Sequence, residues 1–153
     1  MAVDYEAVAA GLNQAIPFNV HLGLQTIEVG PDSGAVTLPA EDHLHNHVGS
    51  QHAGALFSAG EAASGGAFVG AFLEIMGEVT PLAESAQIAY KAIARGEITA
   101  RARFAEDRDA LLAELREKGR VRFPINVELT DPDGKLVAEM TVNWYMRRKS
   151  SES

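Results

Sequence analysis

The longest hydrophobic stretch of the chain follows a polar, histidine-rich segment and extends to residue 76. Ala, Gly, Phe, Leu and Val dominate it, and Glu61 is the only charged residue between His52 and Glu74. A helix that is apolar on every side belongs in the middle of a domain. We therefore predict a central helix of about six turns that ends near Gly77. A lone carboxylate in such a helix must be paired, neutralised by a raised pKa, or used in chemistry.

Glycine and alanine recur along this predicted helix. Each glycine lowers helix stability by up to about 1 kcal/mol relative to alanine. A helix that accepts this cost is expected to need the space, because small side chains let another backbone approach closely. The pattern predicts a central helix that is tightly wrapped by other elements.

Alternating hydrophobic and polar residues predict strands on both sides of the central helix. The predicted strands are residues 24–29, 35–38, 85–94, 97–104, 121–130 and 135–146. The third and fourth are expected to be joined tightly at Arg95 and Gly96, and the last two to form a hairpin around residues 131–134. The sequence thus predicts an α+β domain in which six antiparallel strands wrap around one helix.

Two further helices and a tail complete the prediction. Residues 3–16 form an amphipathic N-terminal helix that Pro17 ends, and residues 107–118 form an extra helix between strands, followed by Gly119. The polar tail from residue 147 to residue 153 is expected to be frayed. No linker or repeat divides the 153 residues, so we expect a single domain over residues 1–153.

Composition excludes several functions. The chain has no cysteine, which rules out disulfides, thiolate metal sites and cysteine nucleophiles. Its net charge of −8 argues against nucleic acid as the main partner. Acidic residues near the N-terminus and the glycine-rich character of the central helix argue against a signal peptide and a membrane span. We expect a cytoplasmic protein.

Four histidines precede or begin the central helix, at positions 43, 45, 47 and 52. Clustered imidazoles can indicate a metal site. These residues lie in a predicted loop that lacks a carboxylate triad and cysteine, so we predict no native metal.

The spacing of three residues around the helix start resembles a known pattern. Asn46 lies six residues before His52, and Glu61 lies nine residues after it. This spacing resembles the PaaI-like acyl-CoA thioesterases of the hotdog fold, and the order of elements fits that fold from about residue 18 to residue 147. The helix at residues 107–118 and the segment around residues 91–104 resemble a less characterised branch of this superfamily. The main departure is Ala53, which occupies the first glycine of the family's His-Gly-Gly motif.

The resemblance implies roles for the residues at the helix N-terminus. The N–H groups of Ala53 and Gly54, together with the helix dipole, would stabilise the oxyanion of a thioester. Glu61 would act as a general base on water or as a nucleophile. Asn46 would orient water or hold the carbonyl, and His52 would fix the loop or cap the helix. No cofactor is expected, since coenzyme A is part of the substrate.

The resemblance also implies an assembly in which each site takes residues from two subunits. We expect a homodimer that can assemble further into a tetramer. Ser85 and Gln87 are the predicted polar contribution of the partner. Lys91 and Arg95 are the predicted contacts to the coenzyme A phosphates, with Arg95 favoured among the basic residues. The predicted lining of the acyl tunnel is Leu56, Phe57, Phe68 and Tyr90.

Two other functions stay open from the sequence. A hotdog module could bind acyl groups without turning them over, and Ala53 in place of glycine favours that interpretation. A hotdog hydratase or dehydratase is the third hypothesis, and it would need a histidine and an acid to share proton transfer. The thioester itself could be carried by coenzyme A or by a carrier protein.

Overall fold

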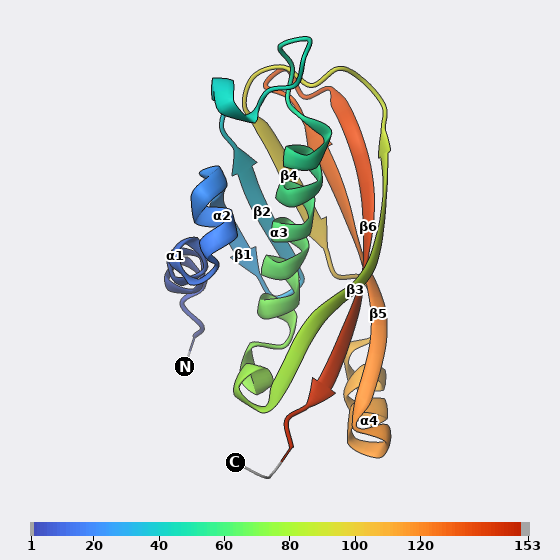
Figure 1. Cartoon of the computed structure of the whole chain (residues 1–153). Coiled ribbons are helices and arrows are strands. Elements are labelled where there is room, and N and C mark those ends of the chain that lie inside the picture. The colour runs from blue at the N-terminus through green and yellow to red at the C-terminus, as the bar shows by residue number, and fades with distance from the viewer. Residues whose placement is uncertain (1, 151–153) are drawn as a thin grey trace.

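A six-stranded antiparallel sheet curls around one long helix, as predicted (Figure 1). The computed structural model describes residues 2–150. The sheet order is β1-β2-β4-β5-β6-β3, and helix α3 (Ala53–Ala71) lies against its inner face. The strands are β1 (Gln25–Gly30), β2 (Ser33–Leu38), β3 (Val79–Tyr90), β4 (Ile98–Arg103), β5 (Arg120–Thr130) and β6 (Leu136–Arg148).

The remaining helices differ in detail from the prediction. The N-terminal segment forms two helices, α1 (Tyr5–Ala15) and α2 (Pro17–Leu22), because proline suits the first turn of a helix and so begins α2. Helix α3 ends at Ala71 and is followed by a 3₁₀ segment, η2 (Leu73–Glu78). Helix α4 (Arg108–Lys118) packs on β5 and ends at Gly119, as expected.

The C-terminal tail is shorter than predicted. Arg147 and Arg148 belong to β6, and the Lys149 N–H donates to the carbonyl of Glu78 at 2.9 Å. Residues 151–153 of the predicted tail lie outside the described residues. Within residues 2–150, none of the helices combines the length and apolarity needed to cross a bilayer.

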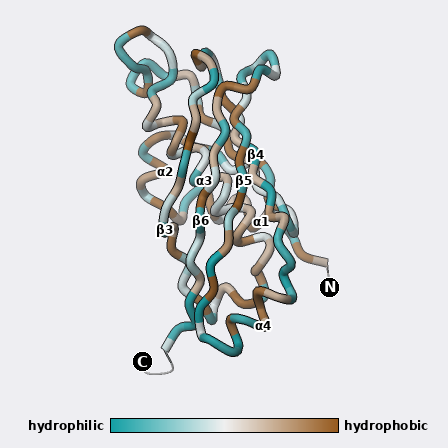
Figure 2. The backbone as a smooth tube through the Cα atoms, turned by 90° about the vertical axis from the view of Figure 1, so that its right-hand side faces the viewer, coloured by the Kyte–Doolittle hydropathy of each residue, from teal (hydrophilic) through white to brown (hydrophobic). Residues whose placement is uncertain are grey.

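The core forms where the inner faces of the strands meet α3. Every second residue of β5 is buried from Val121 to Leu129, and its other residues face outward. Figure 2 shows hydrophobic and hydrophilic residues alternating along this strand. Five aromatic rings pack together at one end of the core, with centroids 5.1–5.5 Å apart. They are Phe68, Phe72, Phe104, Phe123 and Trp144.

Glycines let the sheet approach α3 closely, as the sequence predicted. A Cβ atom added to Gly34 of β2 would lie 2.5 Å from the Ala63 carbonyl oxygen. One added to Gly70 would overlap the carbonyl of Gly30. Both clashes are with backbone atoms, so neither could be relieved by turning a side chain.

The predicted pairing of the third and fourth strands is wrong. β3 pairs with β6, and β4 lies between β2 and β5. Residues 91–97 cross from one side of the sheet to the other instead of forming a tight hairpin at Arg95 and Gly96. β3 is consequently an edge strand, and among the described residues nothing pairs with its second edge.

Candidate functional site

His52 caps the N-terminus of α3, which confirms the capping role expected for it. Its Nδ1 atom accepts a hydrogen bond from the Gly54 N–H at 2.8 Å, so Nδ1 carries no proton in this arrangement. Its carbonyl accepts from the Leu56 N–H at 3.0 Å. The Gly54 N–H is therefore occupied. The Ala53 N–H, at the first position of the helix, has no intrahelical acceptor.

Ala53 fits the backbone at the position where the family motif has glycine. It is the first residue of α3, and no non-glycine residue of the described chain has a positive φ. The Tyr90 hydroxyl at the end of β3 donates to the Ala53 carbonyl at 3.0 Å. Partial burial raises the pKa of Tyr90 above its usual value. Tyr90 thus ties β3 to the first turn of α3.

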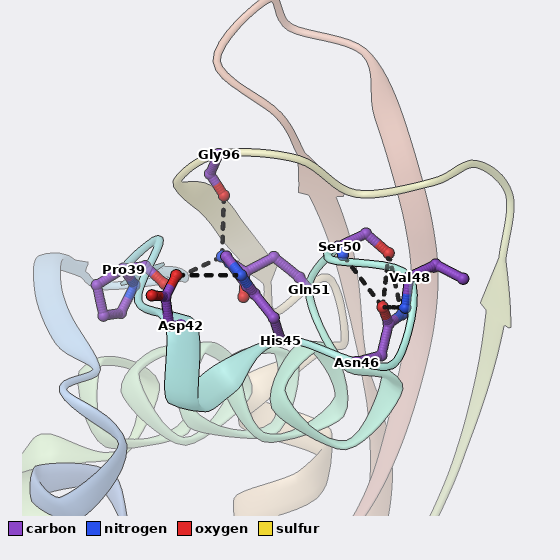
Figure 3. Close-up of polar contacts among 8 residues, drawn as sticks. All are labelled: Pro39, Asp42, His45, Asn46, Val48, Ser50, Gln51 and Gly96. Carbon is purple, nitrogen blue, oxygen red and sulfur yellow. Dashed lines mark hydrogen bonds and ion pairs between the residues drawn. The ribbon is translucent and has the colours of Figure 1, made fainter.

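The side chain of Asn46 is used by its own loop (Figure 3). Its Oδ1 accepts from the N–H groups of Val48 and Ser50, both at 3.1 Å, and its Nδ2 donates to the Ser50 hydroxyl at 2.9 Å. Asparagine is favoured in turns for such contacts. Within the described residues no contact joins Asn46 to Glu61, and its role toward substrate remains a prediction.

Gln51 organises the same region and was not singled out by the sequence. Its buried Nε2 donates to the carbonyls of Pro39 at 3.0 Å and Gly96 at 2.9 Å (Figure 3). Its backbone N–H donates to the Ala94 carbonyl at 2.9 Å. Gln51 therefore joins the end of β2, the segment between β3 and β4, and the entry to α3. The one sequence feature that could have indicated this role is the position of Gln51 directly before His52.

One stripe of α3 is only partly covered by the rest of the chain, so the helix is less enclosed than predicted. Phe57 is exposed, whereas Ser58, Glu61, Gly65 and Val69 are half-buried along the same side. Residues four and eight positions apart lie on one face of a helix. Ala53 and Glu61 therefore share this stripe about 12 Å apart along the axis. Helical side chains lean toward the N-terminus, which brings the Glu61 carboxylate back toward Ala53.

Glu61 is half-buried and unpaired. Among the described residues its carboxylate has no hydrogen-bond or ion-pair partner, although its backbone carbonyl accepts from the Ser64 hydroxyl at 2.7 Å. Burial raises the pKa of Glu61 above the usual range of glutamate. The side chain lines a cavity of about 210 Å³ beside α3. Of the three explanations for this carboxylate, internal pairing is the one that the geometry does not support.

Ser85 and Gln87 point away from α3. They lie opposite Asn143 and Thr141 on the outer face of the sheet, and the Asn143 side chain donates to the Ser85 hydroxyl at 3.0 Å. A register shift between Ala83 and Ser85 causes this orientation. The extra residue of a bulge reverses which side chains face inward beyond it. Within their own chain, Ser85 and Gln87 therefore do not contact a substrate bound on the inner side of the sheet.

Lys91 and Arg95 lie in the segment that packs against the entry to α3. Lys91 contacts Glu139 at 3.9 Å, and both side chains are about half exposed. Arg95 is exposed and has no acidic partner among the described residues, unlike Arg101, Arg103 and Arg122. Arg95 is thus available to an anion, and its contact to a phosphate stays a prediction.

The predicted tunnel residues separate into two groups. Leu56 and Phe68 are buried in the core, and Phe57 and Tyr90 are exposed. Phe68 is the one of the four that lines the cavity beside Glu61.

Three of the histidines line a second hollow, of about 400 Å³, near the start of α3. They are His43, His45 and His52, and the nearest acid is Asp42, 3.9 Å from His45. In residues 2–150 no three histidine or acidic side chains come together as a metal-binding group.

A family model described as a domain of unknown function, DUF4442, matches residues 5–146 of the chain. No curated protein sequence matches this chain. A solved structure from Pseudomonas aeruginosa, described as a protein of unknown function and probable thioesterase, is 27% identical, with a TM-score of 0.84. The alignment covers 97% of this chain and 99% of that one.

Two further solved structures share the fold at lower identity. The PaaI protein of the E. coli phenylacetic acid degradation operon is 18% identical, with a TM-score of 0.69 over 93% of this chain and 91% of that one. A thioesterase family protein from Silicibacter pomeroyi is 17% identical, with a TM-score of 0.76 over 95% and 99%.

Proposed function

This chain is a member of the DUF4442 family with the hotdog fold of thioesterases, and we propose that it hydrolyses an acyl-CoA thioester. The observation that carries the proposal is the unpaired carboxylate of Glu61. It lines a cavity and shares the open stripe of α3 with the helix N-terminus. Burial raises the pKa of Glu61, and perturbed pKa values cluster at functional sites.

In the proposed reaction the thioester carbonyl lies at the start of α3. The Ala53 N–H and the helix dipole stabilise the negative charge that develops on the carbonyl oxygen. Glu61 removes a proton from water as the water oxygen attacks the carbonyl carbon. The tetrahedral intermediate then collapses, the C–S bond breaks, and the thiolate takes up a proton. The products are a carboxylic acid and the free thiol of coenzyme A.

A second route uses Glu61 as the nucleophile. Its carboxylate attacks the carbonyl carbon, expels the thiolate and forms a mixed anhydride, which water then hydrolyses. A single turnover in ¹⁸O-water separates the two routes when the anhydride is cleaved at the Glu61 carbonyl. That cleavage leaves ¹⁸O in Glu61, whereas the general-base route leaves it only in the acid product.

The free edge of β3 supports a homodimer in which two copies pair along this strand. A strand of this length with one unpaired edge offers a row of backbone donors and acceptors to a second chain. Leu82 and Tyr90 are large exposed side chains on the same strand. Ser85, Gln87, Lys91 and Arg95 remain the predicted contacts to substrate in that assembly. The tetramer and the cytoplasmic location also stay predictions.

One observation favours a second function, a module that binds acyl groups without hydrolysing them. The Gly54 N–H is held by His52, so the helix start has one donor fewer for an oxyanion. No contact joins His52 to Glu61 in the described residues, and a hydratase that pairs a histidine with an acid is not proposed.

Thiol release from a panel of short, medium, long and aryl acyl-CoA thioesters tests the proposal. A thiol reagent gives no background from a protein without cysteine. The proposal predicts release from at least one class. No release from any of them, by a folded protein that binds the thioesters, would favour the binding module.

A further inference from the structure

The cavity beside Glu61 has a wall that the resemblance did not imply. One side is the open stripe of α3, and the opposite side is formed by the N-terminal helices. Leu12 and Ile16, from α1 and its junction with α2, line the cavity there together with Asn19 of α2. Pro81 of β3 and Trp144 of β6 close a further side.

Helix α1 is fixed to the sheet by a specific contact. The Asn13 side chain accepts from the Thr26 N–H at 2.6 Å and donates to the Thr26 carbonyl at 3.4 Å. This pair lies where the register of β1 shifts, between Thr26 and Glu28, and it serves the backbone groups of Thr26. The wall therefore has a defined position relative to α3.

The lining is mostly apolar, with Asn19, Thr26 and Glu61 as its polar exceptions, and it leaves room for a ligand. Among the described residues, no lysine or arginine lines the cavity, and Glu61 is the one ionisable side chain there. Gly65 has no side chain to fill the cavity. The space beside it is open, because the one side chain that an added Cβ atom would meet within 4 Å is that of Trp144, at 3.9 Å or more. A nucleotide phosphate would find a carboxylate and no cation here. An apolar acyl or aryl group would instead contact Leu12, Ile16 and Val69.

The volume limits the size of that group. The cavity holds about 210 Å³, whereas sites for drug-sized ligands measure roughly 300–1,000 Å³. It therefore suits a short or medium acyl chain, or one aromatic ring, better than a long chain.

We propose that the α1–α2 helices form the acyl-recognition wall of the site, and that Leu12 and Ile16 set the size of the acyl group accepted. This inference rests on the proposed thioesterase function, because the cavity is assigned to the acyl end of that substrate. The wall would also give a function to the N-terminal segment, for which the sequence suggested none.

The test compares kcat/KM across straight-chain acyl-CoA thioesters of increasing length and two aryl thioesters. Leu12→Trp fills the cavity, and Ile16→Ala enlarges it by truncating a side chain that is 43% exposed. Val20→Trp is the matched control, because Val20 is exposed on α2 and does not line the cavity. Melting curves establish that each variant is folded.

Leu12→Trp is expected to lower kcat/KM for the longer accepted chains by roughly fourfold for each methylene that loses its place. Activity on the shortest chain should stay near that of the wild type. Ile16→Ala should shift the optimum to longer chains, and Val20→Trp should leave it unchanged. An unchanged length profile in both cavity variants, with thioesterase activity intact, overturns the inference and leaves the proposed function standing.

A binding measurement covers the case in which the wild type hydrolyses nothing. S-alkyl-CoA thioethers, which cannot be hydrolysed, are titrated into the wild type and Leu12→Trp by calorimetry. If affinity rises with chain length in the wild type but not in Leu12→Trp, the acyl-recognition wall is supported even though the thioesterase proposal fails. Equal affinities of the two proteins at every chain length contradict the acyl-recognition wall.

Discussion

The indole of Trp144 and the hydroxyl of Ser64 are joined by a hydrogen bond of 3.1 Å in the core, between β6 and α3. Ser64 in turn donates to the Glu61 carbonyl at 2.7 Å. Ser64 is fully buried and Trp144 nearly so. This chain of two hydrogen bonds fixes the turn of α3 that carries Glu61 against the strand that closes its cavity.

Ser64→Ala should destabilise the protein by about 1–3 kcal/mol, because the buried indole N–H loses its acceptor. Urea unfolding measures the free-energy change. Trp144→Phe removes the donor, and in its background Ser64→Ala should cost less. Costs that simply add in the double mutant would show that the hydrogen bond contributes nothing to stability.

Gly70→Ala should destabilise the protein by about 3 kcal/mol, near the upper end of typical overpacking costs. Its methyl group would overlap the backbone carbonyl of Gly30, which cannot move aside as a side chain could. Gly11→Ala in α1 is the control, since a methyl group there meets no atom within 4 Å. It should stabilise by up to about 1 kcal/mol through helix propensity. Thermal unfolding of both variants checks the contrast, and a neutral Gly70→Ala would contradict the close approach.

His52→Ala should cost about 0.5–2 kcal/mol, because the Gly54 N–H loses its cap. His52→Asn should restore that stability, since asparagine is a good N-cap residue. If His52 acts only as a cap, His52→Asn also keeps kcat within a few-fold of the wild type. A fall of roughly a hundredfold or more in the folded His52→Asn protein would instead assign a proton-transfer role to the imidazole.

Glu61 should make stability fall as pH rises. Burial raises the pKa of Glu61 in the folded protein, so the folded state holds this proton more tightly than the unfolded chain does. Its stabilising contribution is therefore complete below the usual glutamate pKa of about 4.3 and is lost as pH rises through the raised value.

The Glu61→Gln side chain stays uncharged at every pH, so this variant should not lose stability through residue 61 as pH rises. Chemical unfolding of the two proteins from about pH 4 to about pH 8 should show the mutant gaining relative stability as pH rises. A stability difference that does not change with pH would contradict the burial of this carboxylate. In the wild type, kcat/KM should rise with pH over the same window, because both proposed roles need the ionised form.

The sequence predicted the features that depend on local pattern. Strict alternation in β5 identified a half-buried strand, and the glycine-rich apolar run identified a helix approached closely by the sheet at Gly34 and Gly70. The spacing of His52 and Glu61 singled out the residue that caps α3 and the unpaired carboxylate, but the open stripe on which Glu61 lies was not predicted. Pro17 was misinterpreted because proline both ends one helix and begins the next.

Features set by distant contacts could not be predicted in this way. Arg95 and Gly96 suggested a hairpin, yet β3 pairs with β6, from Tyr90 with Ala138 to Val79 with Arg148, which are 48 to 69 residues apart in the chain. The bulge after Ala83 reverses the direction of Ser85 and Gln87, and no local pattern marks it. The cavity wall depends on the pairing of Asn13 with Thr26, which the sequence alone does not indicate.

The most direct test of the account is thiol release by Glu61→Gln on the best substrate of the wild type. Glu74→Gln serves as the matched control, because it makes the same change at an exposed glutamate beyond the end of α3. We expect Glu61→Gln to fold, to bind substrate and to lose at least about 99% of kcat/KM, whereas Glu74→Gln retains the wild-type rate. Full activity in folded Glu61→Gln would contradict the catalytic role of this carboxylate.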